Sequence, residues 1–253
     1  MILDSFALHD RTALVTGANT GLGQAIAIAL AQSGADIVCL GRSEPTDTAA
    51  ALGKLGRRCH WVEADLAGSE SAETMLQAAV AAGGPLHILV NNAGTIRRND
   101  ALDFSEADWD EVMEVNLKRA FFLSQAFARH LRADQRGGKI INIASMLSFQ
   151  GGIRVASYTA SKSGLLGLTR LLANEWAAHG IHVNAIAPGY FATNNTQALQ
   201  ADPVRNRDIL TRIPAGAWGQ PSQLGGAAVY LASAASDYVH GSVLAVDGGW
   251  LAR

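Results

Sequence analysis

The sequence predicts an α/β fold: a doubly wound, seven-stranded parallel sheet with helices on both faces, in a single domain. Short apolar runs alternate with longer alanine- and leucine-rich segments from one end of the 253-residue chain to the other. The short runs are apolar throughout, as in strands that are buried on both faces. No repeat, low-complexity tract or Pro/Gly-rich linker divides the sequence. We therefore expect one domain over residues 1–253.

The expected strands and helices follow one another in regular order. Strands are predicted at 12–16, 36–40, 59–63, 87–91, 139–144, 181–186 and 242–246. Helices are predicted near 22–32, 45–55, 69–82, 106–132, 157–178 and 221–233. Right-handed crossovers bring the carboxyl ends of parallel strands to one edge, where such sheets bind their ligands.

Residues 188–220 break this rhythm, because the segment is long, polar and poorly periodic. Compact domains rarely keep such a connection without a use, so we expect a substrate lid or binding loop there. An elaborated loop with one or two short helices is the alternative.

Composition excludes several classes of protein. The net charge is −2 and the basic residues are scattered, which gives no electrostatic footprint for nucleic acid. The start MILDSFALHD does not read as a signal peptide, and the run AIAIALA is too short to span a membrane. We expect a cytoplasmic protein with no nucleic-acid or membrane partner. Cys39 and Cys59 are expected to be core thiols without a disulfide, and the dispersed histidines predict no metal site.

A glycine-rich turn follows the first predicted strand, in TGANTGLGQAIAIAL. Gly17, Gly21 and Gly23 would let the backbone turn tightly, approach a pyrophosphate and present N–H groups at the start of the next helix. The spacing is G-x-x-x-G-x-G, and the more familiar G-x-G-x-x-G is absent. In an alternating α/β chain this position favours phosphate binding over a plain turn.

Polar side chains are predicted to gather at the same edge of the sheet. Asp65 follows the third strand, Asn91 and Gly94 follow the fourth, and Ser145 follows the fifth. We expect Asp65 to accept a hydrogen bond from an adenine amino group, with Asn91 and Gly94 beside the ribose and nicotinamide.

The stretch SYTASK places a tyrosine and a lysine four residues apart at the start of a predicted helix. Tyr158 and Lys162 should therefore share one helix face. An isolated pair of this kind is usually two ordinary surface residues, so its meaning depends on its surroundings.

Taken together, TGANTGLG, NNAG, VNL with Asn116, Ser145, YTASK and APG at 187–189 resemble the short-chain dehydrogenase/reductase family along essentially the whole chain. The resemblance implies hydride transfer with Tyr158 as general acid/base and Ser145 hydrogen-bonded to the reacting oxygen. Lys162 would favour the phenolate and hold the nicotinamide ribose, and Asn116 would help hold a water that relays protons to Lys162. The implied cofactor-binding residues are Gly17, Asn19, Thr20, Gly21, Leu22, Gly23, Arg42, Ser43, Asp65, Leu66, Asn91, Ala93, Gly94, Tyr158, Lys162, Pro188, Gly189 and Thr193.

The choice of cofactor depends on the end of the second strand. Gly41 stands where NAD-preferring relatives often carry an acidic residue, and Arg42 and Ser43 follow it. Arg42 would meet a 2′-phosphate, which favours NADP(H) slightly. If Arg42 only stacks on adenine, NAD(H) remains open.

A narrower resemblance, to the 2-deoxy-D-gluconate 3-dehydrogenase and 2-dehydro-3-deoxy-D-gluconate 5-dehydrogenase subfamily, implies ketone–alcohol interconversion on a deoxy sugar acid. We expect Arg154, together with Arg97, to bind the carboxylate, unless these arginines are interface or surface ion-pair residues. Ser145, Gln150 and Asn194 complete the expected substrate site. The alternatives are another polyol or 3-oxoacyl substrate, or a dinucleotide-sensing regulator without turnover.

The family also implies a homotetramer. Trp250 and Leu251, near the end of the chain, would pack either at a subunit interface or within their own chain.

Overall fold

The computed structural model describes all 253 residues and confirms the predicted parallel sheet. Its seven strands lie in the order β3-β2-β1-β4-β5-β6-β7, and every pairing is parallel. The strands are β1 (Thr12–Thr16), β2 (Asp36–Gly41), β3 (Cys59–Glu63), β4 (Ile88–Asn91), β5 (Gly138–Ile143), β6 (Ile181–Pro188) and β7 (Val243–Val246). After β3 the chain returns past β1 and adds β4 on the other side of it, so the direction in which strands are added to the sheet reverses between β1 and β4. That reversal is the point at which open α/β sheets form a ligand crevice.

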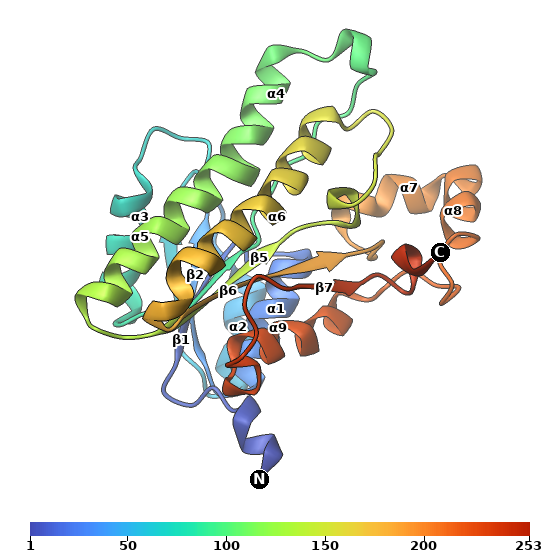
Figure 1. Cartoon of the computed structure of the whole chain (residues 1–253). Helices are drawn as coiled ribbons and strands as arrows, with labels where there is room; N and C mark the ends of the chain where they lie inside the picture. The colour runs from blue at the N-terminus through green and yellow to red at the C-terminus, as the bar shows by residue number, and fades with distance from the viewer.

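Helices cover both faces of the sheet, as Figure 1 shows. On one face lie α1 (Gly21–Gln32), α2 (Thr46–Lys54) and α9 (Gly225–Ala232), and on the other lie α3 (Ala72–Gly83), α5 (Arg119–Ala133) and α6 (Ala156–Trp176). Each layer buries its own apolar cluster against the sheet, with 22 and 21 buried residues respectively. The central strands are therefore buried on both sides, which is why they read as continuous apolar runs. No helix has both the length and the apolar character that crossing a bilayer requires.

The long helix predicted at 106–132 is interrupted. It consists of α4 (Glu106–Met113), a π-helical turn over Glu114–Lys118, and α5. The extra residue in a π-turn changes which side chains face the sheet, and such turns are frequent at functional sites. Asn116 lies in this turn and is buried.

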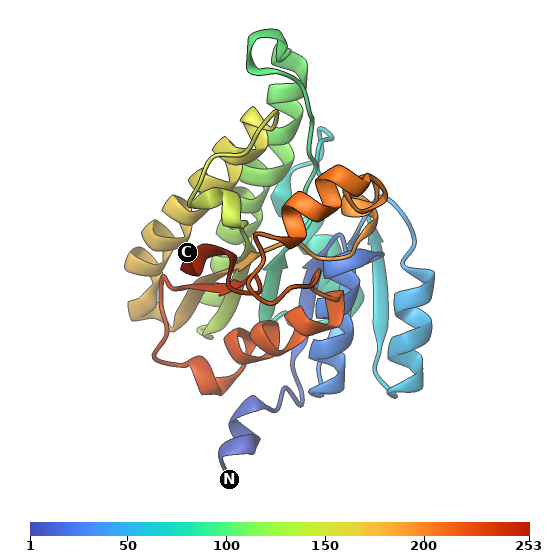
Figure 2. The same ribbon diagram turned by 90° about the vertical axis from the view of Figure 1, so that its right-hand side faces the viewer.

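The 188–220 segment folds into two short helices, α7 (Gln197–Ala201) and α8 (Pro203–Leu210). Both views show them beside the C-terminus of the chain (Figures 1 and 2). Asp202 caps α8 by accepting hydrogen bonds from the backbone N–H groups of Val204 and Arg205, and Pro203 occupies the first turn. The segment therefore has defined local structure of its own.

Candidate active site

The glycine turn between β1 and α1 fits a pyrophosphate. Gly17 adopts a left-handed conformation with φ of +65°, which is open to glycine but costly for most residues. A Cβ at Gly23 would overlap the carbonyl oxygen of Gly17, so this close approach requires glycine. Helix α1 begins at Gly21 with no side-chain cap from Thr20 and no acidic residue in its first turn. Its first N–H groups are therefore available to an anion.

Asn92, which the sequence analysis did not select, holds this turn in place. Its Nδ2 donates to the carbonyl oxygens of Thr16 at 2.9 Å and Gly17 at 3.2 Å. The side chain of Asn91 points the other way and donates to Asn142 Oδ1 at 2.8 Å in the buried interior. Only the backbone of Asn91 is therefore left to border a cofactor. Successive side chains along a strand point to opposite faces of the sheet, so the position of each asparagine at the end of β4 decides which one reaches the glycine turn.

The predicted adenine end lies beside β2 and β3. Arg42 and Ser43 are exposed directly after Gly41, and Arg42 makes no ion pair. Asp65 is exposed, and its Oδ1 accepts a hydrogen bond from the Ala67 N–H at 3.0 Å. The second carboxylate oxygen remains free for an amino group. The other residues expected at the cofactor lie around the glycine turn or at the ends of strands: Asn19, Leu22, Leu66, Ala93, Pro188 and Gly189.

Arg119 is a second residue that the sequence analysis missed. It is 8% exposed, and its guanidinium donates to the carbonyl oxygens of Leu66 at 3.0 Å, Glu70 at 2.6 Å and Gly68 at 2.8 Å. This one side chain thus fixes the loop that follows Asp65 and Leu66. An arginine at the start of a helix gives no sequence signal for such a role, because its partners are distant backbone groups.

Tyr158, Lys162 and Ser145 meet at the carboxyl end of β5. Lys162 is 3% exposed, donates from Nζ to the Ile143 carbonyl oxygen at 2.6 Å, and lies 5.7 Å from the Tyr158 ring centroid. Burial raises the pKa of the Tyr158 phenol, whereas a hydrogen bond with Ser145 and the charge of Arg98 lower it; the net direction is upward. The phenol therefore holds its proton at neutral pH and is suited to give it away.

Asn116 is tied to the loop that follows β4. Its Oδ1 accepts from the Thr95 N–H at 2.8 Å, and its Nδ2 donates to the Thr95 carbonyl oxygen at 2.9 Å and to Ser161 Oγ at 3.3 Å. A Cβ at Gly94 would lie 3.2 Å from Asn116 Oδ1 and 3.7 Å from Lys162 Nζ. The amide thus positions the backbone beside Lys162. The part that Asn116 would take in a water relay to Lys162 stays a prediction.

The buried ammonium of Lys162 is expected to destabilise the fold. Burial lowers its pKa from 10.5 to about 8, which corresponds to roughly 3 kcal/mol of folding free energy at neutral pH. The unfolded chain binds this proton more tightly, so the penalty is complete below pH 8 and disappears as the pH rises to about 10.5. We expect Lys162→Met to raise the free energy of unfolding at pH 7 by about 1 kcal/mol, since loss of the bond to Ile143 offsets part of the gain.

Urea unfolding at pH 7 and pH 10 checks this expectation, because the gain should shrink at the higher pH. Lys118→Met is the matched control, since the Lys118 side chain is 61% exposed and has no desolvation to relieve. A loss of stability in Lys162→Met at pH 7, or a gain equal at both pH values, would contradict the argument.

The two arginines expected to bind a substrate carboxylate are each paired with acidic residues in this structure, and their contact with substrate stays a prediction. Arg97 pairs with Glu111 at 2.6 Å and with Asp108 at 3.5 Å. Arg154 has an exposed side chain and lies 3.3 Å from Asp100. Both guanidinium groups are thus neutralised by neighbouring acids, which is the surface ion-pair alternative.

Arg98 follows Arg97 in the loop after β4, and its charge acts on the Tyr158 phenol. It is exposed and forms no ion pair. Its charge lowers the pKa of the Tyr158 phenol and also that of the Tyr190 phenol, although burial raises both. A cation without an acidic partner therefore stands near enough to Tyr158 to act on its phenol.

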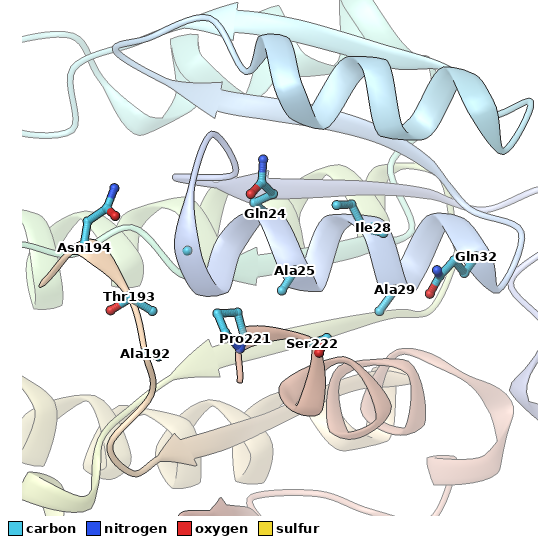
Figure 3. Close-up of a pocket in the computed structure, with 11 residues that line it drawn as sticks. Gln24, Ala25, Ile28, Ala29, Gln32, Ala192, Thr193, Asn194, Pro221 and Ser222 are labelled. Carbon is cyan, nitrogen blue, oxygen red and sulfur yellow. The ribbon is translucent and has the colours of Figure 1, made fainter. Parts of the chain in front are cut away.

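Thr193 and Asn194 lie on the cofactor side of the 188–220 segment. They border an open groove of about 330 Å³ between α1 and Pro221–Ser222, shown in Figure 3. A Cβ at Gly21 would lie 3.7 Å from Thr193 Cγ2, so Thr193 closes over the start of α1. Tyr158 does not line this groove, and the contact of Asn194 with substrate stays a prediction. Gln150 is half-buried in the loop after Ser145 and stays a predicted substrate residue.

The glycine turn suits a dinucleotide and lies at the switch point of a parallel sheet, where the Tyr158 phenol and the buried Lys162 ammonium also lie. This is the architecture of an NAD(P)-dependent oxidoreductase. The family profile described as short chain dehydrogenase matches residues 11–204. The chain belongs to this family, as its motifs predicted. No group of three or more metal-binding side chains comes together in the structure.

Several dehydrogenases are similar to this chain in sequence and structure along its whole length. It is 62% identical to the 2-dehydro-3-deoxy-D-gluconate 5-dehydrogenase of Escherichia coli K12 over 253 residues, which cover 100% of both chains. A crystal structure from Agrobacterium tumefaciens with bound NADP, provisionally assigned as a 2-deoxy-D-gluconate 3-dehydrogenase, is 59% identical with a TM-score of 0.91, covering 98% of this chain and 99% of that one. A gluconate 5-dehydrogenase from Burkholderia cenocepacia J2315, in complex with NADP and tartrate, is 40% identical with a TM-score of 0.94 and covers 100% of both chains.

Proposed function

We propose that the enzyme interconverts a ketone and a secondary alcohol on a deoxy sugar acid. The expected pair is 2-dehydro-3-deoxy-D-gluconate and 3-deoxy-D-glycero-2,5-hexodiulosonate, with 2-deoxy-D-gluconate as a related substrate. The observation that carries the chemistry is the meeting of the Tyr158 phenol, the Ser145 hydroxyl and the Lys162 ammonium at the end of β5. The 62% sequence identity to the E. coli relative, over the full length of both chains, supports the choice of substrate.

Three residues of this chain would act at or beside one atom, the oxygen of the substrate's reacting carbonyl group. Ser145 would donate a hydrogen bond to the carbonyl oxygen and stabilise the negative charge that develops there. Tyr158 would give its proton to the same oxygen, and in the reverse direction its phenolate would take the alcohol proton. Lys162 would stabilise the phenolate. The nicotinamide cofactor supplies or accepts the hydride.

The proposed cofactor site runs along the edge of the sheet. The glycine turn and the start of α1 would hold the pyrophosphate, with Thr193 closing over it. Lys162 has two further N–H donors beyond the one given to Ile143, and these suit the hydroxyl groups of the nicotinamide ribose. Arg42 would bind the 2′-phosphate of NADP(H), because it is exposed, unpaired and follows Gly41. Relatives solved with NADP support this preference.

The proposed substrate site places the carboxylate at Arg98. Sugar acids need a cation, and Arg98 provides one without an acidic partner near Tyr158. The relative in complex with tartrate, itself a hydroxy acid, supports an acid-binding site in this group of proteins.

The decisive experiment follows the absorbance of NADPH and of NADH in parallel with purified protein and 3-deoxy-D-glycero-2,5-hexodiulosonate. We expect rapid oxidation of NADPH and slower oxidation of NADH, because Arg42 favours the phosphate. Oxidation of neither cofactor, in a preparation that binds NADPH, would sink the substrate assignment. Faster oxidation of NADH would overturn the role given to Arg42.

We also propose that the protein is a cytoplasmic homotetramer. Exposed apolar side chains along α4 and α5, Trp109 at 40% and Phe122 at 42%, support a subunit contact on this face. Light scattering should give four times the 26.5 kDa chain mass, and a monomer mass would contradict the proposal.

A further inference from the structure

The last residues of the chain form a compact turn against the end of α8. Asp247 accepts hydrogen bonds from the backbone N–H groups of Gly249 and Leu251, both at 2.9 Å. Trp250 is 4% exposed within its own chain. The turn therefore presents a large indole to the 188–220 segment and not to solvent.

Four contacts join this turn to the 188–220 segment. The Trp250 ring lies edge-on to Tyr190 with 5.0 Å between centroids, and the Arg212 guanidinium lies 4.1 Å above the indole. The Ala215 N–H donates to the Gly248 carbonyl oxygen at 3.0 Å, and the Arg253 guanidinium donates to the Thr211 carbonyl oxygen at 2.7 Å. The turn thus contacts the start of the segment at Tyr190 and the chain that leaves α8. Figure 2 shows the C-terminus on the same side of the molecule as α7 and α8.

The same indole connects the segment to the reacting groups. Trp250, Ile209, Ile213 and Met146 form one buried cluster, and Met146 directly follows Ser145 in the chain. Helix α8 has eight residues and buries only Ile209. A helix this short has little stability of its own, so its contacts with the rest of the chain fix its place. These are the packing of Ile209 in the cluster with Trp250 and the hydrogen bond that Trp218 Nε1 donates to Asn206 Oδ1 at 2.7 Å.

We infer that Trp250 is a positioning residue that latches the 188–220 segment over the sugar-acid site. The inference rests on the proposed function for the identity of the substrate but not for the contact itself. The latch acts through the packing of the indole on Tyr190, Arg212 and Ile213. Its loss would let α8 move while leaving the glycine turn and the buried Lys162 intact.

The test compares Trp250→Ala, Trp250→Phe and the control Tyr238→Ala, whose side chain is fully exposed. Hydrogen exchange over residues 203–215, measured with NADPH bound and without substrate, reports the position of α8 directly. We expect faster exchange there in Trp250→Ala alone. The same variant should show a roughly tenfold higher KM for the sugar acid with an unchanged NADPH Kd. Trp250→Phe keeps a ring for Tyr190 and Arg212, so it should restore both properties.

Each outcome bears on one proposal. Unchanged exchange at 203–215 in Trp250→Ala would overturn the latch, whatever the substrate. Equal losses in Trp250→Phe and Trp250→Ala would also overturn it, because phenylalanine keeps a ring against Tyr190 and Arg212 and packing of a ring there would then not hold α8 in place. Absence of turnover in the wild-type protein would sink the proposed substrate while the exchange result still decides the latch. Loss of NADPH affinity in Trp250→Ala would show a general structural defect and would contradict the assigned role.

Discussion

Replacing Tyr158 by phenylalanine is expected to lower kcat by roughly 10²- to 10⁴-fold and to leave the affinity for NADPH unchanged. The substitution removes one oxygen atom and keeps the ring, so Lys162, whose Nζ lies 5.7 Å from the ring centroid, retains its surroundings. What is lost is the proton donor. Burial raises the pKa of this phenol, which keeps it protonated at neutral pH for reduction of a ketone.

Turnover and cofactor binding must be measured on the same preparation. Titration by NADPH fluorescence gives the Kd, and initial rates with saturating sugar acid give kcat. Tyr238→Phe is the matched control, because Tyr238 is fully exposed and should change neither value. If Tyr158→Phe retains more than about a tenth of the wild-type kcat, a different group delivers the proton.

The sheet was predictable because its strands are buried on both faces. The residues of β1 and most of those of β2 are buried, and such strands appear in the sequence as unbroken apolar runs. The positions of Tyr158, Lys162 and Ser145 follow from the same logic. The end of a strand and the first two turns of a helix are local features, and parallel topology gathers the carboxyl ends of the strands and the amino ends of the following helices at one edge of the sheet.

The partners of individual polar side chains were harder to predict. The side chains of Asn91 and Asn92 face opposite directions, and a shift of one residue at the end of β4 would exchange which of them holds the glycine turn. The π-turn at Glu114–Lys118 leaves no pattern in the sequence, yet it places Asn116 against Thr95. In both cases the outcome depends on backbone geometry that residue types do not specify.

The arginines show the same limit for charge. Arg97, Arg98 and Arg154 are indistinguishable as cations in the sequence. Arg97 is neutralised by acids on α4 and Arg154 by Asp100 in a facing loop. Which cation stays free is decided by contacts between segments that are distant along the chain, and these contacts appear only once the loops are placed.

Arg98→Gln is therefore expected to raise KM for the sugar acid by roughly 10- to 100-fold, because a hydrogen bond to a charged partner contributes about 1.5–3 kcal/mol. The NADPH Kd should stay unchanged. Arg97→Gln and Arg154→Gln are matched controls, and each should change KM by less than about threefold, as is usual for exposed ion pairs. Initial rates across a range of substrate concentrations give all three KM values.

The substrate's own charge supplies a second, independent test of the same contact. A methyl ester of the acid removes the negative charge, so the wild-type enzyme should bind it more weakly by a factor close to that of Arg98→Gln with the acid. If the two groups contact each other, Arg98→Gln should cause little further loss with the ester. Additive losses would show that Arg98 acts elsewhere. A larger effect of Arg154→Gln than of Arg98→Gln would mean that the pair with Asp100 opens to receive the carboxylate, as the sequence alone predicted.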